Sequence, residues 1–341
     1  MLTPSFSLKD LDAEDARTAL LVARFTESEL GVPLQGARLL IALSGGADST
    51  ALLVLFCALR GKYGLSLAAA HLDHALRKES AEEAEAACAL CRELGVGFFS
   101  RREDVGEKAR LWRCGVEEAG RRVRYAFLED CRRDWGASWI LTAHHVGDLA
   151  EDVLMRLMRG AAWPGLGGME AVVEEEGRRV LRPLLMLEKK DLSGMLLRLG
   201  VPWREDSSNA DRAWKRNRVR HDMLPLFLAE NPNFYESVRR LWRCAQRDRA
   251  AWKAQAGLAL EEADGGLLIS DEALKKLGGE GRMRAMAEAL GRMGGEVRAD
   301  SLERVEAAWL RRLFPRHFSF GGGVKAELSG RGVYFHRASG R

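Results

Sequence analysis

Residues 37–55 read ARLLIALSGGADSTALLVL, and this stretch decides the fold of the chain. Its first part, residues 39–43, is a short apolar run typical of a strand buried in a parallel sheet. The sequence Ser-Gly-Gly at residues 44–46 ends the run, and the apolar residues 51–59 are numerous enough for a helix that residues 48–50 can cap. The stretch therefore predicts a strand, a glycine turn and a helix in succession.

The glycine turn has the properties of a phosphate-binding loop. Two adjacent glycines let backbone N–H groups approach an anion, and the start of the helix adds free N–H groups and the positive end of its dipole. The lysine of a Walker loop is absent. A carboxylate beside bound phosphates needs a divalent cation, so Asp48 predicts a Mg²⁺ site. The residues expected to hold the phosphate or pyrophosphate are Ser44, Gly45, Gly46, Ala47, Asp48 and Ser49. The alternative is an ordinary tight turn with a capping aspartate.

The composition limits the class of protein. The chain has 341 residues, enough for two domains, and its net charge of +4 is compatible with nucleic-acid binding without establishing it. Six cysteines, and no apolar signal-peptide core in residues 1–10, predict a cytoplasmic protein with reduced thiols. No apolar run is long enough to span a bilayer, so we expect no association with a membrane.

Strands alternate with helices over residues 38–160, which predicts an α/β fold built on a doubly wound parallel sheet. The second strand, residues 65–72, ends at Asp73 and His74. Open parallel sheets bind ligands at the carboxyl ends of their strands. These two side chains are therefore expected beside the glycine turn.

The fourth strand, residues 138–142, is followed by a group of ionisable side chains. If a helix continues from it, His144, Asp148 and Glu151 share one face at positions i, i+4 and i+7. A histidine with two carboxylates suits metal binding or proton transfer. We expect this group to form the second half of a site with Asp48.

Basic residues gather in three segments. Residues 117–128 form a charged helix, residues 215–220 hold four basic residues in six positions, and residues 233–256 form an arginine-rich linker helix. Such density suits contacts with nucleic-acid phosphates. The arginines expected to make these contacts are Arg121, Arg124, Arg218, Arg220, Arg239, Arg240 and Arg243.

Two domains are expected on these grounds. The first is a catalytic domain, residues 1–220. The second, residues 221–341, contains the linker helix and a smaller, mostly helical C-terminal domain with strand-like runs near residues 324–328 and 332–336. The basic linker favours RNA binding by this domain, and the alternative is an oligomerisation module.

Four blocks of sequence resemble the PP-loop ATP pyrophosphatases and, within them, the tRNA(Ile)-lysidine synthetases. The first is SGGADS at residues 44–49, and the second is HLDHALR at residues 71–77. The third is AHHVGDLAE at residues 143–151, followed by RLMRG at 156–160 and GLGGM at 165–169. The fourth is DSSN at residues 206–209 with RNRVRH at 216–221. The first block indicates the superfamily, whereas the third and fourth indicate the narrower family.

This resemblance implies an adenine nucleotide α-hydrolase-like fold and a two-step ligation that uses ATP and Mg²⁺. Such enzymes adenylate the C2 oxygen of the wobble cytidine, position 34, in a tRNA(Ile) with a CAU anticodon and release pyrophosphate. L-lysine then displaces AMP. The modified base pairs with A rather than G, which changes decoding from AUG to AUA.

The resemblance also implies roles for individual residues. Asp48 binds Mg²⁺, Asp148 and Glu151 position lysine or handle its proton with help from His144, and Arg216 or Arg218 stabilises the adenylate or the cytidine. The implied catalytic residues are Asp48, His144, Asp148, Glu151 and Arg216, and the implied nucleotide-binding residues are those of the loop with Asp73, His74 and Arg77. The arginines named above become the tRNA-binding residues, and a homodimer is a further expectation.

Two alternative functions follow from features in which this sequence differs from the family pattern. Gly147 stands where the family has the first of two adjacent acids, and Leu149 stands where a glutamine is common. These departures motivate a non-catalytic tRNA- or nucleotide-binding protein. Cys88 and Cys91 form a CxxC that motivates a related PP-loop tRNA thiolase with an iron–sulfur cluster. We expect these two cysteines to pack on a helix face instead, because no second CxxC follows.

Overall fold

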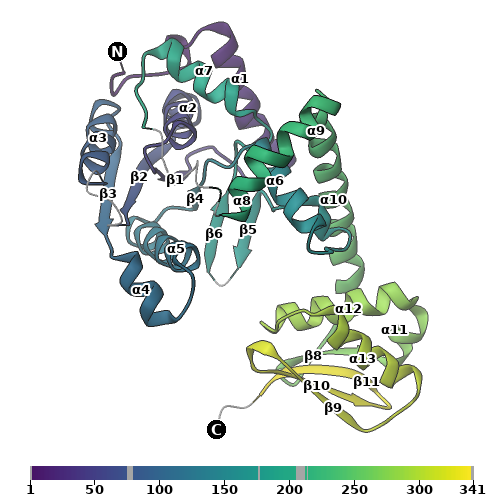
Figure 1. Ribbon diagram of the computed structural model, residues 1–341. Helices are drawn as coiled ribbons and strands as arrows, with labels where there is room; N and C mark the ends of the chain where they lie inside the picture. Colours follow the sequence, from purple (N-terminus) through teal and green to yellow (C-terminus); the bar gives the residue numbers. More distant parts are fainter. Residues whose placement is uncertain (1, 75–79, 176, 205–211, 213, 339–341) are drawn as a thin grey trace. The chain divides into compact units, whose positions relative to one another are not determined.

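The computed structural model describes residues 2–338 apart from residues 75–79, 176, 205–211 and 213. The chain divides into two compact units, Met1–Trp242 and Arg243–Arg341 (Figure 1). No helix in the described ranges combines the length and the apolar character that crossing a membrane requires.

A six-stranded sheet organises the first unit. Its strands are β1 (Arg38–Ala42), β2 (Ser66–Asp73), β3 (Gly97–Arg102), β4 (Trp139–Leu141), β5 (Val172–Glu175) and β6 (Arg178–Leu181). Their spatial order is β3-β2-β1-β4-β6-β5, and all pairs are parallel except β5 with β6. The chain first runs from β1 towards β3 and then returns to the other side at β4. The strand order therefore reverses between β1 and β4, where doubly wound sheets bind ligands.

Helices cover both faces of this sheet because alternate strand residues point to opposite sides. Leu39 and Ile41 of β1 belong to one core cluster with residues of α1 (Ala13–Arg24), α2 (Ala47–Tyr63), α3 (Ser80–Glu93) and α7 (Lys189–Leu199). Leu40 belongs to the opposite cluster, with Tyr125 and Leu128 of α5 (Val116–Trp135). The short helix α4 (Val105–Trp112) packs against α5. This three-layer arrangement confirms the predicted α/β fold (Figure 1).

The first unit ends later than predicted. The sequence placed the boundary after residue 220, but α9 (Leu224–Glu230) and the start of α10 (Phe234–Gly257) pack with α6 (Val146–Leu157). Leu224, Val238 and Trp242 are buried in one cluster with Leu149 of α6. Because of these apolar contacts, the first unit extends to Trp242. Helix α8 (Lys215–Arg218) and a π-helical turn (Val219–Met223) precede them.

The glycine-rich segment at residues 163–169 packs onto the first unit. Its residues Gly167 and Gly168 are buried against α6. A Cβ atom on Gly168 would lie only 2.6 Å from Cδ1 of Leu149. The glycine therefore allows this segment to pack closely onto the helix.

The second unit combines helices with a five-stranded antiparallel sheet. Its helices are α11 (Asp271–Lys276), α12 (Gly279–Arg292) and α13 (Ala299–Leu310). Its strands are β7 (Glu261–Ala263), β8 (Gly266–Ser270), β9 (Arg316–Phe320), β10 (Val324–Ser329) and β11 (Gly332–Arg337), in the spatial order β7-β8-β11-β10-β9. The prediction of a mostly helical domain is thus incomplete. Only β10 and β11 were expected; β9 and β7 form hairpins with their sequence neighbours β10 and β8, and β8 joins the sheet through a pairing with β11 that is distant in sequence.

The two units differ in charge. Residues 243–341 contain 18 Lys and Arg against 13 Asp and Glu, a net charge of +5. Residues 1–242 contain 35 Lys and Arg against 36 Asp and Glu, a net charge of −1. The basic excess of the chain therefore lies entirely in the second unit.

Candidate active site

The turn between β1 and α2 presents an open helix end. Helix α2 begins at Ala47, earlier than the expected Ala51, because Gly46 in extended backbone serves as its N-cap residue. Within the described part of the chain, no side chain caps this helix. Its first N–H groups therefore point out of the helix end, where an anion binds favourably.

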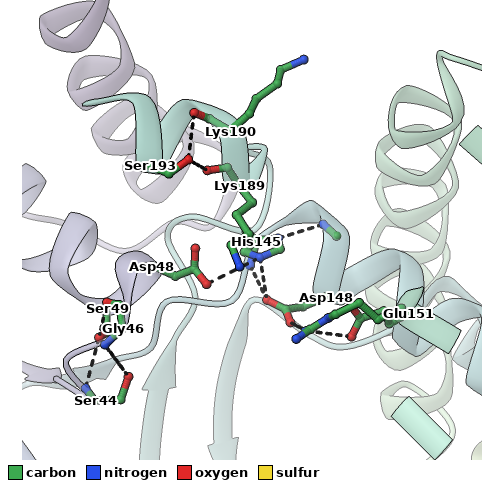
Figure 2. A network of polar contacts seen from close by, with 12 residues as sticks. Ser44, Gly46, Asp48, Ser49, His145, Asp148, Glu151, Lys189, Lys190 and Ser193 are labelled. Atoms are coloured by element: carbon green, nitrogen blue, oxygen red, sulfur yellow. Dashed lines mark hydrogen bonds and ion pairs between the residues drawn. The ribbon is translucent and has the colours of Figure 1, made fainter. Parts of the chain in front are cut away.

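The loop before this helix is held by its own hydrogen bonds. The hydroxyls of Ser44 and Ser49 lie 3.0 Å apart, and Ser49 Oγ donates to the carbonyl oxygen of Gly46 at 3.1 Å (Figure 2). Gly45 has a φ of +85°, which an L side chain rarely adopts. The loop is therefore formed before any ligand arrives.

Asp48 lies in the first turn of α2 and faces the residues that follow β4 (Figure 2). Its Oδ2 is 3.8 Å from Nε2 of His145, whereas its Oδ1 is buried and finds no hydrogen-bond partner in the part of the chain that the structure describes. Burial raises the pKa of Asp48, and the nearby His145 and Lys189 oppose this shift. A buried carboxylate oxygen without a partner fits a ligand for Mg²⁺, a cation that prefers oxygen.

Asp148 and Glu151 lie on one face of α6, as expected, but two arginines already bind them. Arg216 donates to Asp148 Oδ1 at 2.9 Å and to Glu151 Oε2 at 2.8 Å. Arg220 donates to Asp148 Oδ1 at 3.1 Å and to Glu151 Oε1 at 2.5 Å. Glu151 is almost fully buried, so these arginines supply the charge that its ionised form needs.

The fourth oxygen of this carboxylate pair is also used. Asp148 Oδ2 accepts a hydrogen bond from the backbone N–H of His145 at 3.0 Å, and it lies 3.5 Å from Nε2 of the same histidine. Burial acts to raise the pKa of Asp148, but His145, His144 and Arg216 outweigh burial and hold the pKa well below its usual range. Asp148 is therefore a weak base in this arrangement.

The two adjacent histidines, His144 and His145, have different surroundings in the structure. His144 precedes α6 and does not share its face, because the helix begins at Val146 with His145 as the N-cap residue. The Nδ1 atom of His144 lies 3.0 Å from Thr142 Oγ1. Burial, with Arg182 and Arg216 nearby, lowers the pKa of His144 to about 3. The helical alignment predicted for His144 is wrong, and its low pKa argues against a role in accepting a proton.

His145 and Lys189 were not selected from the sequence. Figure 2 shows the Lys189 side chain extending from α7 towards His145. The sequence carried a signal for His145, since it stands three residues before Asp148, and the two form a reciprocal helix cap. It carried none for Lys189, which reaches the site only through the packing of α7 on α2.

Asp73 and His74, two further predicted nucleotide-binding residues, lie at the carboxyl end of β2. Asp73, the last residue of β2, is buried with Oδ2 lying 3.4 Å from Nε of Arg102. The imidazole of His74 lies near α5, where a Cβ on Gly120 would be 3.8 Å from it. Arg77 lies outside the described residues. Contacts of these three with a nucleotide stay predictions.

The arginines expected to bind tRNA fall into two groups. The first lies on α8, the following π-helical turn and α10, and the second lies on α5. Arg220 binds the carboxylate pair, and Arg239 donates to the carbonyl of Met186 at 2.9 Å and to Glu188 at 3.2 Å, so both stabilise the fold. Arg218 donates to the carbonyl of Arg212 at 2.9 Å. Arg240 is exposed and lies within 3.4 Å of Ser237 Oγ, and Arg243 begins the second unit.

Arg121 and Arg124 form the second group. Their guanidinium carbons lie 5.1 and 5.7 Å from the ring centre of Tyr125. Burial lowers the pKa of Arg124, and the charges of Arg121 and Arg216 act in the same direction. A buried cation close to other cations favours a bound anion, so Arg121 and Arg124 stay predicted phosphate contacts.

Of the two cysteines of the CxxC, Cys91 packs in the core and Cys88 is half-buried. Cys91 is fully buried in the cluster that contains Cys57, and burial raises the pKa of each thiol to about 12. Across the described ranges, no three His, Cys, Asp or Glu side chains are grouped so that they could hold a metal ion. A Mg²⁺ ion at Asp48 would therefore take its remaining ligands from phosphates and water, as this ion commonly does.

Comparison with known proteins agrees with this geometry. A model of the PP-loop domain matches residues 20–227. The chain is 49% identical over 237 residues to the tRNA(Ile)-lysidine synthase of Nitratidesulfovibrio vulgaris, an alignment that covers 70% of this chain and 68% of that protein. The chain belongs to the tRNA(Ile)-lysidine synthase family of PP-loop proteins.

Other relatives extend the comparison. The tRNA(Ile)-lysidine synthase of Geobacter sulfurreducens is 34% identical over 323 residues, covering 94% of this chain and 63% of that protein. The chain thus spans about two thirds of the length of these two synthases. Among solved structures, the U34-tRNA thiolase NcsA from Methanococcus maripaludis, with its 4Fe–4S cluster, has a TM-score of 0.58 at 16% identity, covering 69% of this chain and 80% of that one. This likeness shows the shared fold alone.

His144 provides a pH prediction for this family member. We expect stability to fall as the pH is lowered from about 6.5 towards about 3, because the unfolded chain binds a proton on this imidazole that the folded protein, with its lowered pKa, excludes. His144→Asn should make this pH dependence shallower. Urea unfolding curves between pH 7.5 and 4.5 measure the slope.

The matched control is His317→Asn, since the side chain of His317 in the second unit is 70% exposed. It should leave the slope as in the wild type. An equal slope for His144→Asn and wild type would contradict the assigned pKa.

Proposed function

We propose that this chain is an ATP-dependent ligase that attaches L-lysine to C2 of the wobble cytidine, position 34, of a tRNA(Ile) with a CAU anticodon. The observation that carries the proposal is that two groups of residues lie close together at the carboxyl ends of β1 and β4. Asp48 at the open end of α2 lies 3.8 Å, from Oδ2 to Nε2, from His145, which is the N-cap residue of α6. His145 in turn lies 3.5 Å from Asp148, which shares one face of α6 with Glu151. Membership of the lysidine synthase family supplies the reaction that such a site would perform.

The first step would transfer AMP from ATP to the C2 oxygen and release pyrophosphate. The free N–H groups of α2 and the loop at residues 44–46 would bind the pyrophosphate. Lys189, whose charge acts on Asp48, would add a positive charge beside the bound pyrophosphate. Asp48 would hold Mg²⁺ through its unpartnered Oδ1, and the ion would neutralise charge as the α–β bond breaks.

The second step would bring the amine of lysine to C2 and release AMP. Asp148 and Glu151 are the carboxylates suited to the lysine ammonium, but all four of their oxygens already accept hydrogen bonds. Lysine can use them only if Arg216 or Arg220 moves away. An adenylate phosphate offers Arg216 a new partner, so we infer that adenylation would open the lysine site.

The use of tRNA(Ile) in this proposal rests on the name of the family. A cytoplasmic location and a homodimer complete the proposal. The thiolase alternative is not favoured, because Cys91 is buried with a raised pKa rather than exposed as a reactive thiolate. The non-catalytic alternative is not favoured either, because the loop, Asp48 and the carboxylate pair are all in place.

The test of this function is direct. The protein is incubated with ATP, L-lysine and an unmodified tRNA(Ile) with a CAU anticodon, and the tRNA is analysed by mass spectrometry after nuclease digestion. We expect a lysine-dependent mass gain on the wobble nucleotide, and none when ATP or lysine is omitted. A mass gain that corresponds to sulfur would support the thiolase instead. No change with a tRNA that a known lysidine synthase modifies would support the non-catalytic alternative.

Asp48→Asn should abolish pyrophosphate release while leaving the fold intact. The amide has the size of the carboxylate but lacks the charge that would hold Mg²⁺ beside the phosphates. A coupled pyrophosphate assay measures the loss, with circular dichroism to confirm folding. Asp130→Asn, on the exposed surface of α5, is the control. Full activity of Asp48→Asn at ordinary Mg²⁺ concentration would remove Asp48 from the site.

The basic second unit should bind phosphates of the tRNA. We expect a protein ending at Trp242 to bind ATP normally but to bind tRNA more weakly, because it lacks the unit with a net charge of +5. A plot of log affinity against log salt concentration should be less steep, by roughly 0.7–0.9 for each tRNA phosphate that the shortened protein no longer neutralises. Equal affinity and slope for both proteins would instead favour an oligomerisation role.

A further inference from the structure

The imidazole of His145 is fixed in one orientation by the helix that it caps. Its Nδ1 accepts a hydrogen bond from the backbone N–H of Gly147 at 3.0 Å. An accepting Nδ1 carries no proton, so in the neutral ring the proton is on Nε2. The side chain is buried, and it has one free N–H to offer.

That N–H points between the two halves of the site. Nε2 lies 3.8 Å from Asp48 Oδ2 and 3.5 Å from Asp148 Oδ2 (Figure 2). Oδ2 of Asp48 thus faces the histidine. The other oxygen, Oδ1, is buried and has no hydrogen-bond partner among the residues that the structure describes.

Residue 147 must be glycine for this orientation. A Cβ atom on Gly147 would lie 2.7 Å from Cε1 and 3.0 Å from Nδ1 of His145, which is closer than real Cβ contacts allow. On another side, the hydroxyl of Tyr235 would be 3.6 Å from the same atom. Any larger residue at this position would push the imidazole out of its place.

We propose that His145 is a positioning residue for the metal ligand: supported by Gly147, it fixes the Asp48 carboxylate so that Oδ1 faces the divalent cation. The proposal rests on the proposed function for the identity of that cation as Mg²⁺ bound with ATP. Groups that hold a ligating carboxylate in place commonly change metal affinity by about 10- to 100-fold when they are removed. Gly147 has a structural reason for its presence, namely the space that the imidazole occupies.

The first measurement tests the orientation in the wild-type protein. Histidine is labelled with ¹⁵N, and the His145 signals are assigned by their loss in His145→Asn. We expect nitrogen shifts and couplings typical of the Nε2–H tautomer with an accepting Nδ1. Signals typical of a proton on Nδ1 would overturn the proposal.

The second measurement uses two variants that displace the imidazole in different ways. His145→Asn keeps a good N-cap residue but cannot reach Asp48, and Gly147→Ala keeps the imidazole but removes its space. Binding of Mn²⁺, as a spectroscopic substitute for Mg²⁺, is measured by electron paramagnetic resonance with a non-hydrolysable ATP analogue present. We expect the apparent metal affinity to fall by about 10- to 100-fold in both variants.

The control is Gly61→Ala in the interior of α2, where a Cβ atom meets nothing within 4 Å. It should bind metal as the wild type does, and thermal unfolding checks that all three variants are folded. Wild-type metal affinity in either displaced variant would overturn the proposal without affecting the proposed ligation. If the two displaced variants bind metal more weakly as expected but the wild-type protein forms no lysidine product, the proposed ligation is overturned and the role of His145 stays in place.

Discussion

The site depends on the burial of Glu151. An ionised carboxylate that is only 1% exposed is stable inside a protein only if cations and hydrogen bonds compensate for lost hydration. Helix α6 supplies no cation at the right position, and the guanidinium groups of Arg216 and Arg220 do so from 65 and 69 residues further along the chain. These ion pairs hold the segment of α8 and the following π-helical turn against α6. The catalytic edge of the sheet is therefore completed by residues that come long after its last strand.

The fold of the first unit could be predicted because its pattern is local. The apolar run of β1, the glycine turn and the apolar helix α2 each appear within a few residues, and such units repeat until β4. The boundary of the unit could not be predicted in this way. It depends on Trp242, whose indole N–H donates to the carbonyl of Met169 at 2.9 Å, a hydrogen bond between residues that no local pattern connects. The antiparallel sheet of the second unit was missed in part for the same reason, since β8 pairs with β11 across more than 60 residues.

From the sequence, residue types for the candidate site could be predicted, but the arrangement of the histidines around them could not. Asp48, Asp148 and Glu151 were found because carboxylates after strand ends point to chemistry in any doubly wound sheet. The two adjacent histidines carry the same chemical signal, and only the start of α6 distinguishes them. His145 becomes the N-cap residue, whereas burial, with nearby arginines, lowers the pKa of His144. From the sequence, Gly147 was interpreted as the loss of an acidic residue. In the structure, this glycine leaves the space that the imidazole of His145 occupies, because a Cβ atom here would lie too close to the ring.

The ion pairs within the site also decide where an incoming cation binds. Asp148 and Glu151 are already neutralised by two arginines, so a divalent cation would meet like charge there and would have to displace hydrogen bonds. Asp48 presents the opposite situation, because burial raises its pKa and one of its oxygens has no partner. The imidazole of His145 stands between these carboxylates and contacts both. A divalent cation would therefore bind more favourably at the open end of α2, where phosphates would also bind, and under the proposed function the paired carboxylates of α6 would receive the lysine ammonium once an arginine had moved.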